Sequence, residues 1–600
     1  MHTTPSETTS AATAPATGKL ALADFKADHR LLILAGMSLV VGSSGAFAAW
    51  GLIKLIALVT NLVWFGRLDT ASVSLAHAAR TPWMVAAPIL GGLTVGLMAR
   101  FGSEKIRGHG IPEAIEAILI GGSRMSPKVA VLKPISSAIA IGTGGPFGAE
   151  GPIIMTGGAI GSLFAQLFHL SAAERKTLLV AGAAAGMTAI FGTPVAAVLL
   201  AVELLLFEWR PRSFIPVVVA ATCAICWRPL LFGATPLFPF TADPTLPWWG
   251  LIACAGMGIV GGLQSAALTK LLYSFEDAFE RLPIHWMWWP ALGGLVVGLG
   301  GLIEPRALGV GYDVIHDLLS SQLLPRVVVA ILLVKAGIWL VALSSGTSGG
   351  VLAPLLILGG AMGWLAGLVL PGAPVFWALL GMAAMLGGTM RAPLTGAIFA
   401  VELTGDYHAL PAMLAASTAA YAVTVLLMKR SILTEKIARR GQHVSREYGV
   451  DPHELTRVSE IMVREVDILA ADLPVPAAIA ILAAGRHRIY PVLDAARRPV
   501  GLVSRADALL WQVEGGHGGE LLGERVSDAS LPLIHSDEVT ARAVDIMLAT
   551  DQGRLPVVDR RTGVLVGLVT RKDLLKVRAS VARSEKNRSA YLAPRKRRAR

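Results

Sequence analysis

The sequence predicts an α-helical polytopic membrane protein whose last quarter forms a separate α+β domain in water. Hydrophobic residues make up 54% of the 600 positions and charged residues only 16%, whereas soluble domains carry about a quarter of charged residues. The charges are also uneven, because residues 451–600 hold 24 Lys or Arg and 19 Asp or Glu, which is 43 of the 94. An ordinary soluble protein is therefore excluded, and the net charge of +12 does not indicate a nucleic-acid partner.

The first 25 residues are predicted to be a disordered leader. Residues 1–18 are rich in Ser, Thr, Ala and Pro, and they lack the basic and apolar regions of a signal peptide. Lys26, His29 and Arg30 then precede the first apolar run, which favours a cytoplasmic N-terminus by the positive-inside bias.

Residues 26–440 form the predicted membrane domain. Its apolar runs are uneven, since residues 31–66 can cross a bilayer at a steep tilt, whereas 192–203 and 392–403 cover about half of one. Short runs cut by Gly and Pro predict broken helices, whose ends are tolerated in a membrane where they are buried in protein or line a watery cavity. This pattern favours a transporter or a channel.

An internal repeat divides the membrane domain into two copies of one unit. Pro194 and Glu203 recur 199 positions later as Pro393 and Glu402, and we expect both acids to be structural groups satisfied by backbone. The residues leave open whether the copies are parallel or inverted, but duplicated halves place the substrate site at their interface. The matching segments are 192–205 with 391–404 and 152–163 with 354–365, and the copies span about 30–230 and 245–430.

Three clusters of Gly and Pro predict helices that begin inside the membrane. They are Gly108-His-Gly-Ile-Pro112, Gly148-Ala-Glu-Gly-Pro152 and Gly349-Gly-Val-Leu-Ala-Pro354. Proline suits the first turn of a helix, and a helix start exposes unpaired N–H groups that carry about half a positive charge. Several starts aimed at one position would bind an anion and still release it. Helix breaks made for packing alone are the alternative.

The three clusters resemble the GSGIP, GREGP and GxFAP motifs of CLC chloride channels and proton-coupled chloride antiporters. The resemblance covers about residues 30–440 and implies a homodimer of CLC-type inverted repeats of broken, tilted helices, with an anion pathway in each subunit. It implies that Glu150 is the gating carboxylate, which occupies an anion site and moves away when it is protonated or displaced. A lone acid is also costly in a membrane, so Glu150 is functional on physical grounds. The anion-binding residues that the resemblance implies are His109, Gly110, Ile111, Glu150, Gly151, Val351, Leu352 and Leu433.

Lys133 matches an intramembrane lysine of the family that lies near the pathway. There it would add positive potential for the anion. The alternative is a lysine that snorkels to the membrane surface.

Five positions depart from the family pattern. His109 replaces the serine that coordinates the central anion, Leu433 replaces the tyrosine of the last membrane helix, and Leu204 stands at the inner proton-relay glutamate. Ala149 and Leu352 replace a basic residue and a phenylalanine. We therefore predict channel-like or weakly proton-coupled transport of chloride or other small anions, with a proton-coupled antiporter as the alternative. His109 either binds the anion in a pH-dependent manner or turns away to cap backbone.

After a linker at residues 441–454, two matching units at about 455–580 resemble a tandem pair of CBS domains. Tyr490-Pro-Val-Leu-Asp in the first unit corresponds to Leu555-Pro-Val-Val-Asp in the second, and each unit is predicted as helix, strand, strand, helix. The family's S/T-x-x-D pattern implies binding of an adenine nucleotide that modulates transport, whereas a hydroxyl that only caps the following helix is the alternative. The residues that match this pattern are Ser504, Asp507, Thr570 and Asp573.

Residues 581–600 form a predicted disordered basic tail, which from Arg583 onward contains eight basic residues and one acidic residue. A basic segment tethered to a membrane gains about 1 kcal/mol per basic residue from anionic lipid, so we expect lipid contact and a cytoplasmic C-terminus. The expected location is the bacterial inner membrane, and no cofactor is required.

Two other functions match parts of the sequence less well. Gly346-Thr-Ser-Gly349 fits the G-x-S-G of rhomboid-type intramembrane proteases, in which a histidine assists the serine. His408 lies in a loop-like segment, however, and a protease would explain neither the repeat nor Glu150. A cation transporter would need clustered carboxylates along its pathway, and these spans offer few. An enzyme is therefore not expected.

Overall fold

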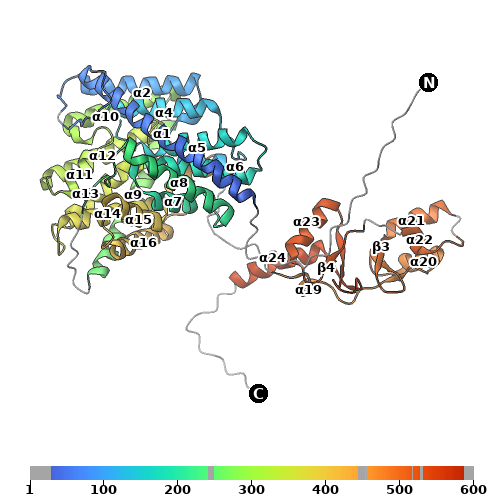
Figure 1. Cartoon of the computed structure of the whole chain (residues 1–600). Helices are drawn as coiled ribbons and strands as arrows, with labels where there is room; N and C mark the ends of the chain where they lie inside the picture. The colour runs from blue at the N-terminus through green and yellow to red at the C-terminus, as the bar shows by residue number, and fades with distance from the viewer. Residues whose placement is uncertain are drawn as a thin grey trace, which may run out of the picture. The chain divides into compact units, whose positions relative to one another are not determined.

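The computed structural model describes residues 29–76, 78–240, 249–442, 453, 456–515, 518–526 and 531–586 (Figure 1). The chain forms two compact units, Met1–Arg446 and Glu447–Arg600, which divide inside the predicted linker. The predicted leader, most of that linker and residues 587–600 of the basic tail lie outside the described residues.

The named elements of the first unit are all helices, and they fall into two halves of the same order. The first half contains α1 Arg30–Phe65, α2 Trp83–Phe101, α3 Ile111–Leu119, α4 Pro127–Gly142, α5 Glu150–Gln166, α6 Ala172–Phe191, α7 Pro194–Leu200 with a π-helical continuation at Ala201–Leu206, and α8 Pro211–Leu231. The second contains α9 Gly250–Glu280, α10 Trp289–Ile303, α11 Tyr312–Leu319, α12 Pro325–Ser344, α13 Leu352–Ala366, α14 Pro374–Met390, α15 Pro393–Thr404 and α16 Leu410–Leu427. A last helix, α17 Ile432–Arg439, follows both halves, and short 3-10 turns occur at Glu104–Ile106, Trp286–Trp288 and Pro305–Ala307.

Helix lengths agree with the uneven apolar runs of the sequence. Among the described residues, seven helical stretches are long and apolar enough to cross a membrane, one of which is α1 with 36 residues. The helices α7 and α15 are short, as expected for residues 192–203 and 392–403. Proline lies in the first turn of many helices because its fixed φ suits that position and its missing N–H is not needed there. These helices are α3, α4, α7, α8, α10, α12, α14, α15 and α16.

The two halves pack through helices of equal rank. α2 contacts α10, α7 contacts α15, and α5 contacts α13. Glycines allow the closest of these approaches, because a Cβ on Gly92 would overlap the carbonyl of Pro290, and one on Gly294 would overlap that of Pro88. Part of the high glycine content therefore brings membrane helices together.

Two carboxylates cap helix starts across the boundary between the halves. Glu402 at the end of α15 accepts hydrogen bonds from the N–H groups of Val195 (3.0 Å) and Ala196 (2.8 Å) at the start of α7. Glu203 accepts from the N–H (2.9 Å) and the hydroxyl (2.6 Å) of Thr395 at the start of α15. Both acids thus complement the positive end of the other half's helix, which agrees with their predicted structural role.

The second unit contains two three-stranded sheets. In the first sheet β1 Leu469–Ala470 pairs parallel with β2 Ile489–Leu493, which pairs antiparallel with β3 Pro499–Ser504. The second repeats this order with β4 Ile534–His535, β5 Arg554–Val558 and β6 Leu565–Thr570. The helices are α19 Val458–Ile461, α20 Val475–Ala484, α21 Arg505–Glu514, α22 Leu522–Val526, α23 Thr540–Thr550 and α24 Arg571–Lys586.

Two short helices pack against the sheet that they do not directly precede in the sequence: α19 comes before the first sheet but packs on the second, and α22 comes before the second sheet but packs on the first. Val458 of α19 is buried in the core of the second sheet with Ile534 and Leu555, and Leu522 of α22 is buried in the core of the first with Leu469. The predicted order of helix, strand, strand, helix is therefore incomplete, because a short strand and a further helix precede each hairpin. Helix α24 also continues to Lys586, past the predicted start of the tail.

Candidate anion-binding site

The three Gly and Pro clusters lie together as the loops that precede α3, α5 and α13. Gly148 and Gly350 exchange backbone hydrogen bonds of 3.2 and 2.8 Å, and the N–H of Gly349 donates to the carbonyl of Gly108 at 3.4 Å. Gly110 has a φ of +89°, which suits glycine, and it directly precedes α3. Segments about 200 residues apart in the chain therefore present helix starts to one region, as the clusters predict.

Glu150 is the first residue of α5, and its side chain reaches the start of α13. The residue is fully buried, and its Oε1 accepts a hydrogen bond of 3.0 Å from the N–H of Ala353. Within the described part of the chain its Oε2 has no hydrogen-bond partner. The carboxylate therefore occupies a helix start whose free N–H groups would otherwise face an anion.

The remaining predicted anion-binding residues are buried around these helix starts. Gly151 follows Glu150, and a Cβ there would overlap the carbonyl of His109, so the loop before α3 packs directly on α5. The backbone N–H groups of the α13 start come from apolar residues that add no charge to the region. The predicted anion-binding residues that are buried, besides Glu150 and His109, are Gly110, Ile111, Gly151, Val351, Leu352 and Leu433.

His109 is 2% exposed and lies two residues before the start of α3. The charges that act on it are those of Lys436, Glu113, Lys133 and Arg440. Its Nδ1 has no hydrogen-bond partner among the described residues, so this nitrogen does not cap backbone there.

Lys133 of α4 is fully buried, and its Nζ donates to the carbonyls of Ile106 (2.8 Å) and Gly108 (2.7 Å). The snorkelling alternative is therefore wrong, because the ammonium holds the loop that presents His109. Sequence reasoning missed its counterpart Lys335 on α12, which is equally buried and donates to the carbonyl of Gly309 at 2.9 Å. The 202-residue offset of the repeat, which relates the two lysines, would have identified it.

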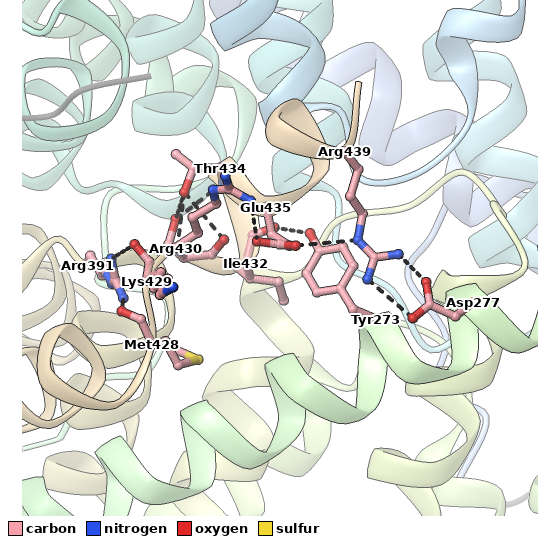
Figure 2. Close-up of polar contacts among 11 residues, drawn as sticks. Tyr273, Asp277, Arg391, Met428, Lys429, Arg430, Ile432, Thr434, Glu435 and Arg439 are labelled. Atoms are coloured by element: carbon pink, nitrogen blue, oxygen red, sulfur yellow. Dashed lines mark hydrogen bonds and ion pairs between the residues drawn. The ribbon is translucent and has the colours of Figure 1, made fainter. Parts of the chain in front are cut away.

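Helix α17 is held in place by polar contacts that the sequence does not predict (Figure 2). The hydroxyl of Tyr273 on α9 donates to the carbonyl of Ile432 at 2.5 Å. Arg439 lies 4.7 Å from the centre of the Tyr273 ring and forms ion pairs with Asp277 and Glu435. These contacts fix the position of Leu433, the apolar residue at the family's tyrosine position.

A cavity of about 620 Å³ lies beside α3 and α17 and has a mixed charged lining. Glu113 of α3 is nearly buried and pairs with Lys436 of α17 (3.0 Å) and with Arg440 (3.1 Å), which directly follows that helix. Arg107 also lines this cavity and lies 4.5 Å from the centre of the Trp286 ring. An ion reaching His109 from this side would therefore meet fixed charges of both signs.

The serine of the protease alternative has no histidine beside it among the described residues. The Oγ of Ser348 contacts the hydroxyls of Ser136 (3.1 Å) and Ser137 (2.9 Å). The backbone N–H of His408 donates to Asp406, which belongs to a separate turn. This arrangement does not activate a nucleophile.

The predicted nucleotide residues form two equivalent contacts at the starts of α21 and α24. The Ser504 hydroxyl donates to Asp507 at 2.7 Å, and the Thr570 hydroxyl donates to Asp573 at 2.6 Å. Burial raises the pKa of the Asp573 carboxyl, but hydrogen bonds from Lys576 and Thr570 outweigh burial and hold that pKa below its ordinary value. Both aspartates therefore take part in helix caps.

Comparison with known proteins identifies a family match for each of the two units. A family model described as voltage gated chloride channel matches residues 90–425, and a CBS domain model matches 458–514 and 525–580. The chain is 32% identical over 427 residues to the voltage-gated ClC-type chloride channel ClcB of Escherichia coli strain K12, covering 69% of this chain and 100% of that protein. The solved structure of a slow cyanobacterial Cl⁻/H⁺ antiporter matches with a TM-score of 0.59 and 24% identity, over 69% of this chain and 98% of that chain. A eukaryotic CLC transporter matches with a TM-score of 0.58 and 19% identity, over 91% of this chain and 98% of that chain.

Proposed function

The chain belongs to the voltage-gated chloride channel (CLC) family and carries a tandem CBS pair, and we propose that it conducts chloride or other small anions through the site at the starts of α3, α5 and α13. The observation that carries this proposal is the buried Glu150 carboxylate bound to the N–H of Ala353 at a helix start. A group that sits where an anion would bind competes with that anion, which makes Glu150 the gate.

We propose that transport is channel-like or only weakly coupled to protons. Leu204 is fully buried where the family's inner proton-relay glutamate would stand, and Leu433 supplies no hydroxyl. Glu203, the acid next to Leu204, is bound by backbone and side chain of Thr395, which leaves it engaged in helix capping. A proton-coupled antiporter is the second candidate, because the cyanobacterial protein that shares this fold is a Cl⁻/H⁺ antiporter.

Chloride flux from liposomes tests both the proposed anion conduction and the proposed weak proton coupling. Purified protein in liposomes is expected to release chloride down its gradient when valinomycin balances the charge, with little proton movement, because no relay carboxylate stands at position 204. Absence of chloride release, while a known CLC protein works in parallel, would contradict anion conduction. Stoichiometric proton uptake driven by a chloride gradient would favour the antiporter instead.

We further propose the assembly and orientation that the family pattern suggests. The protein forms a homodimer in the bacterial inner membrane, and both termini lie in the cytoplasm. The basic residues from Arg583 onward support contact with anionic lipid of the cytoplasmic leaflet.

We propose that the CBS pair binds an adenine nucleotide and modulates transport, with Asp507 and Asp573 in equivalent positions. Isothermal titration of the full chain with ATP, ADP and AMP is expected to show binding, and Asp573→Asn should weaken it about tenfold because a charged acceptor is lost. Asp559→Asn is the matched control, since that carboxylate accepts from Thr562 in an exposed turn. Absence of binding heat at millimolar nucleotide would contradict the proposal.

A further inference from the structure

Lys335, in the second half of the membrane unit, places a buried ammonium at the loop that precedes α11. Its ammonium is fully buried and bound to the carbonyl of Gly309, and a Cβ on Gly311 would lie 3.1 Å from that nitrogen. A Cβ on Gly311 would also lie 2.7 Å from Cδ1 of Ile357 on α13, the helix whose start binds Glu150. The charges that act on Lys335 are those of Asp313 and Glu150. Of these two carboxylates, Asp313 already accepts a hydrogen bond from the Ser74 hydroxyl.

Tyr312 brings a hydroxyl to the same region. It directly follows Gly311 and starts α11, at the position where the first half has the apolar Ile111 at the start of α3. Its ring packs against Phe191 and Phe238, with ring centres 6.3 and 6.0 Å away. Its hydroxyl is buried and has no hydrogen-bond partner within the described ranges, and the charge that acts on it is that of Glu150.

Two buried oxygens therefore lack a hydrogen-bond partner among the described residues, one on Glu150 in the first half and one on Tyr312 in the second half. Glu150 uses only Oε1 at the start of α13, and its Oε2 is without a partner among the described residues, like the Tyr312 hydroxyl. Burying a hydroxyl without a hydrogen-bond partner is unfavourable, so a packing role for the Tyr312 ring alone would favour phenylalanine.

We propose that Tyr312 and Lys335 form the receiving site for the Glu150 carboxylate when an anion takes its place at the start of α13. In that position the Tyr312 hydroxyl donates to the carboxylate, and the Lys335 ammonium balances its charge. The second half of the repeat thus stabilises the displaced, still ionised gate, whereas the first half uses Lys133 to shape the anion-binding loop. This inference rests on the proposed gating role of Glu150.

The test measures chloride flux of the full chain in liposomes between about pH 5 and pH 8. Tyr312→Phe keeps the ring packing, and it is expected to lower flux at about pH 8 roughly tenfold because an ionised gate loses a hydrogen bond. At about pH 5, where more of the gate is neutral, the loss should be less than about twofold. Lys335→Met should act in the same direction.

The same substitutions on a Glu150→Gln background decide whether the hydroxyl acts on the gate. With no carboxylate to receive, Tyr312→Phe is expected to leave the pH profile of that background unchanged. Tyr273→Phe is the matched control, because its hydroxyl binds the carbonyl of Ile432, and its effect should be equal in both backgrounds.

Two results would overturn the receiving site and leave the proposed function standing. An equal loss of flux from Tyr312→Phe in both backgrounds would show that the hydroxyl acts on the conducted anion. If Tyr312→Phe leaves the pH profile unchanged in both backgrounds, the Tyr312 hydroxyl contacts neither the gate nor the anion. If the parent protein does not conduct, or if Glu150→Gln behaves like the parent, the proposed function fails together with this inference. Flux measurements on the parent and on Glu150→Gln detect this failure without any Tyr312 variant.

Discussion

Glu150→Gln is expected to keep chloride flux high across the pH range instead of letting it fall as the pH rises. The carboxylate at the start of α13 accepts a charge-assisted hydrogen bond from Ala353, and such bonds contribute about 1.5–3 kcal/mol. A neutral amide competes less well with chloride, so flux at about pH 8 should rise roughly tenfold to a hundredfold. At acid pH, where the wild-type gate is itself neutral, variant and wild type should converge.

Chloride efflux from liposomes at several pH values measures this effect, and Glu402→Gln provides the matched control. Glu402 is also a carboxylate that caps a membrane helix, but it binds the start of α7. Its substitution should leave the pH profile in place. Unchanged flux and an unchanged pH profile in Glu150→Gln would show that the carboxylate at α13 is not the gate.

On a Glu150→Gln background, chloride affinity is expected to increase as the pH falls through the titration of His109, and His109→Ser should remove that increase. An imidazolium adds a full charge beside the anion, whereas serine offers one neutral hydrogen bond. A unit charge at about 4 Å contributes up to about 4 kcal/mol near a protein surface, so at least a tenfold change in affinity is expected. Protonation and chloride binding favour each other by linkage, so a pH drop must tighten binding if the ring faces the ion.

Chloride titrations at about pH 5 and pH 8 check this linkage. Other charged groups act on the ring, namely Glu113, Lys436, Lys133 and Arg440, and the His109→Ser comparison separates their contribution. His408→Ser is the control substitution, because His408 lies in the turn after α15. Equal affinities at both pH values would show that the His109 ring does not take up a proton beside the anion in this range.

The candidate site was largely predictable because its parts are local in sequence. A helix start inside a membrane needs Gly and Pro at adjacent positions, so the clusters around His109, Glu150 and Val351 were visible without the fold. A lone acid in an apolar segment likewise stands out by composition. The structure confirms that these three loops meet, through the hydrogen bonds of Gly148 with Gly350 and of Gly108 with Gly349.

The second half of the site was missed because its signals are weak when taken alone. Lys335 and Tyr312 lie in segments without the Pro-containing motifs of the first half, and only the offset of the repeat relates them to Lys133 and Ile111. Their significance depends on proximity to Glu150, which no local pattern encodes. The contact between Tyr273 and Ile432 is of the same kind, since 159 residues separate its partners.

The sequence by itself determined a membrane domain of duplicated broken helices, a water-soluble α+β domain after it, and a buried acid among helix starts. These properties follow from composition, periodicity and short motifs, which depend on neighbouring residues alone. Only the tertiary structure decided that Glu203 and Glu402 each cap the other half's helix, that Lys133 binds a loop instead of reaching the surface, and that α19 and α22 exchange cores. Each of these contacts joins residues far apart in the chain, and their partners are set by how the helices and sheets pack.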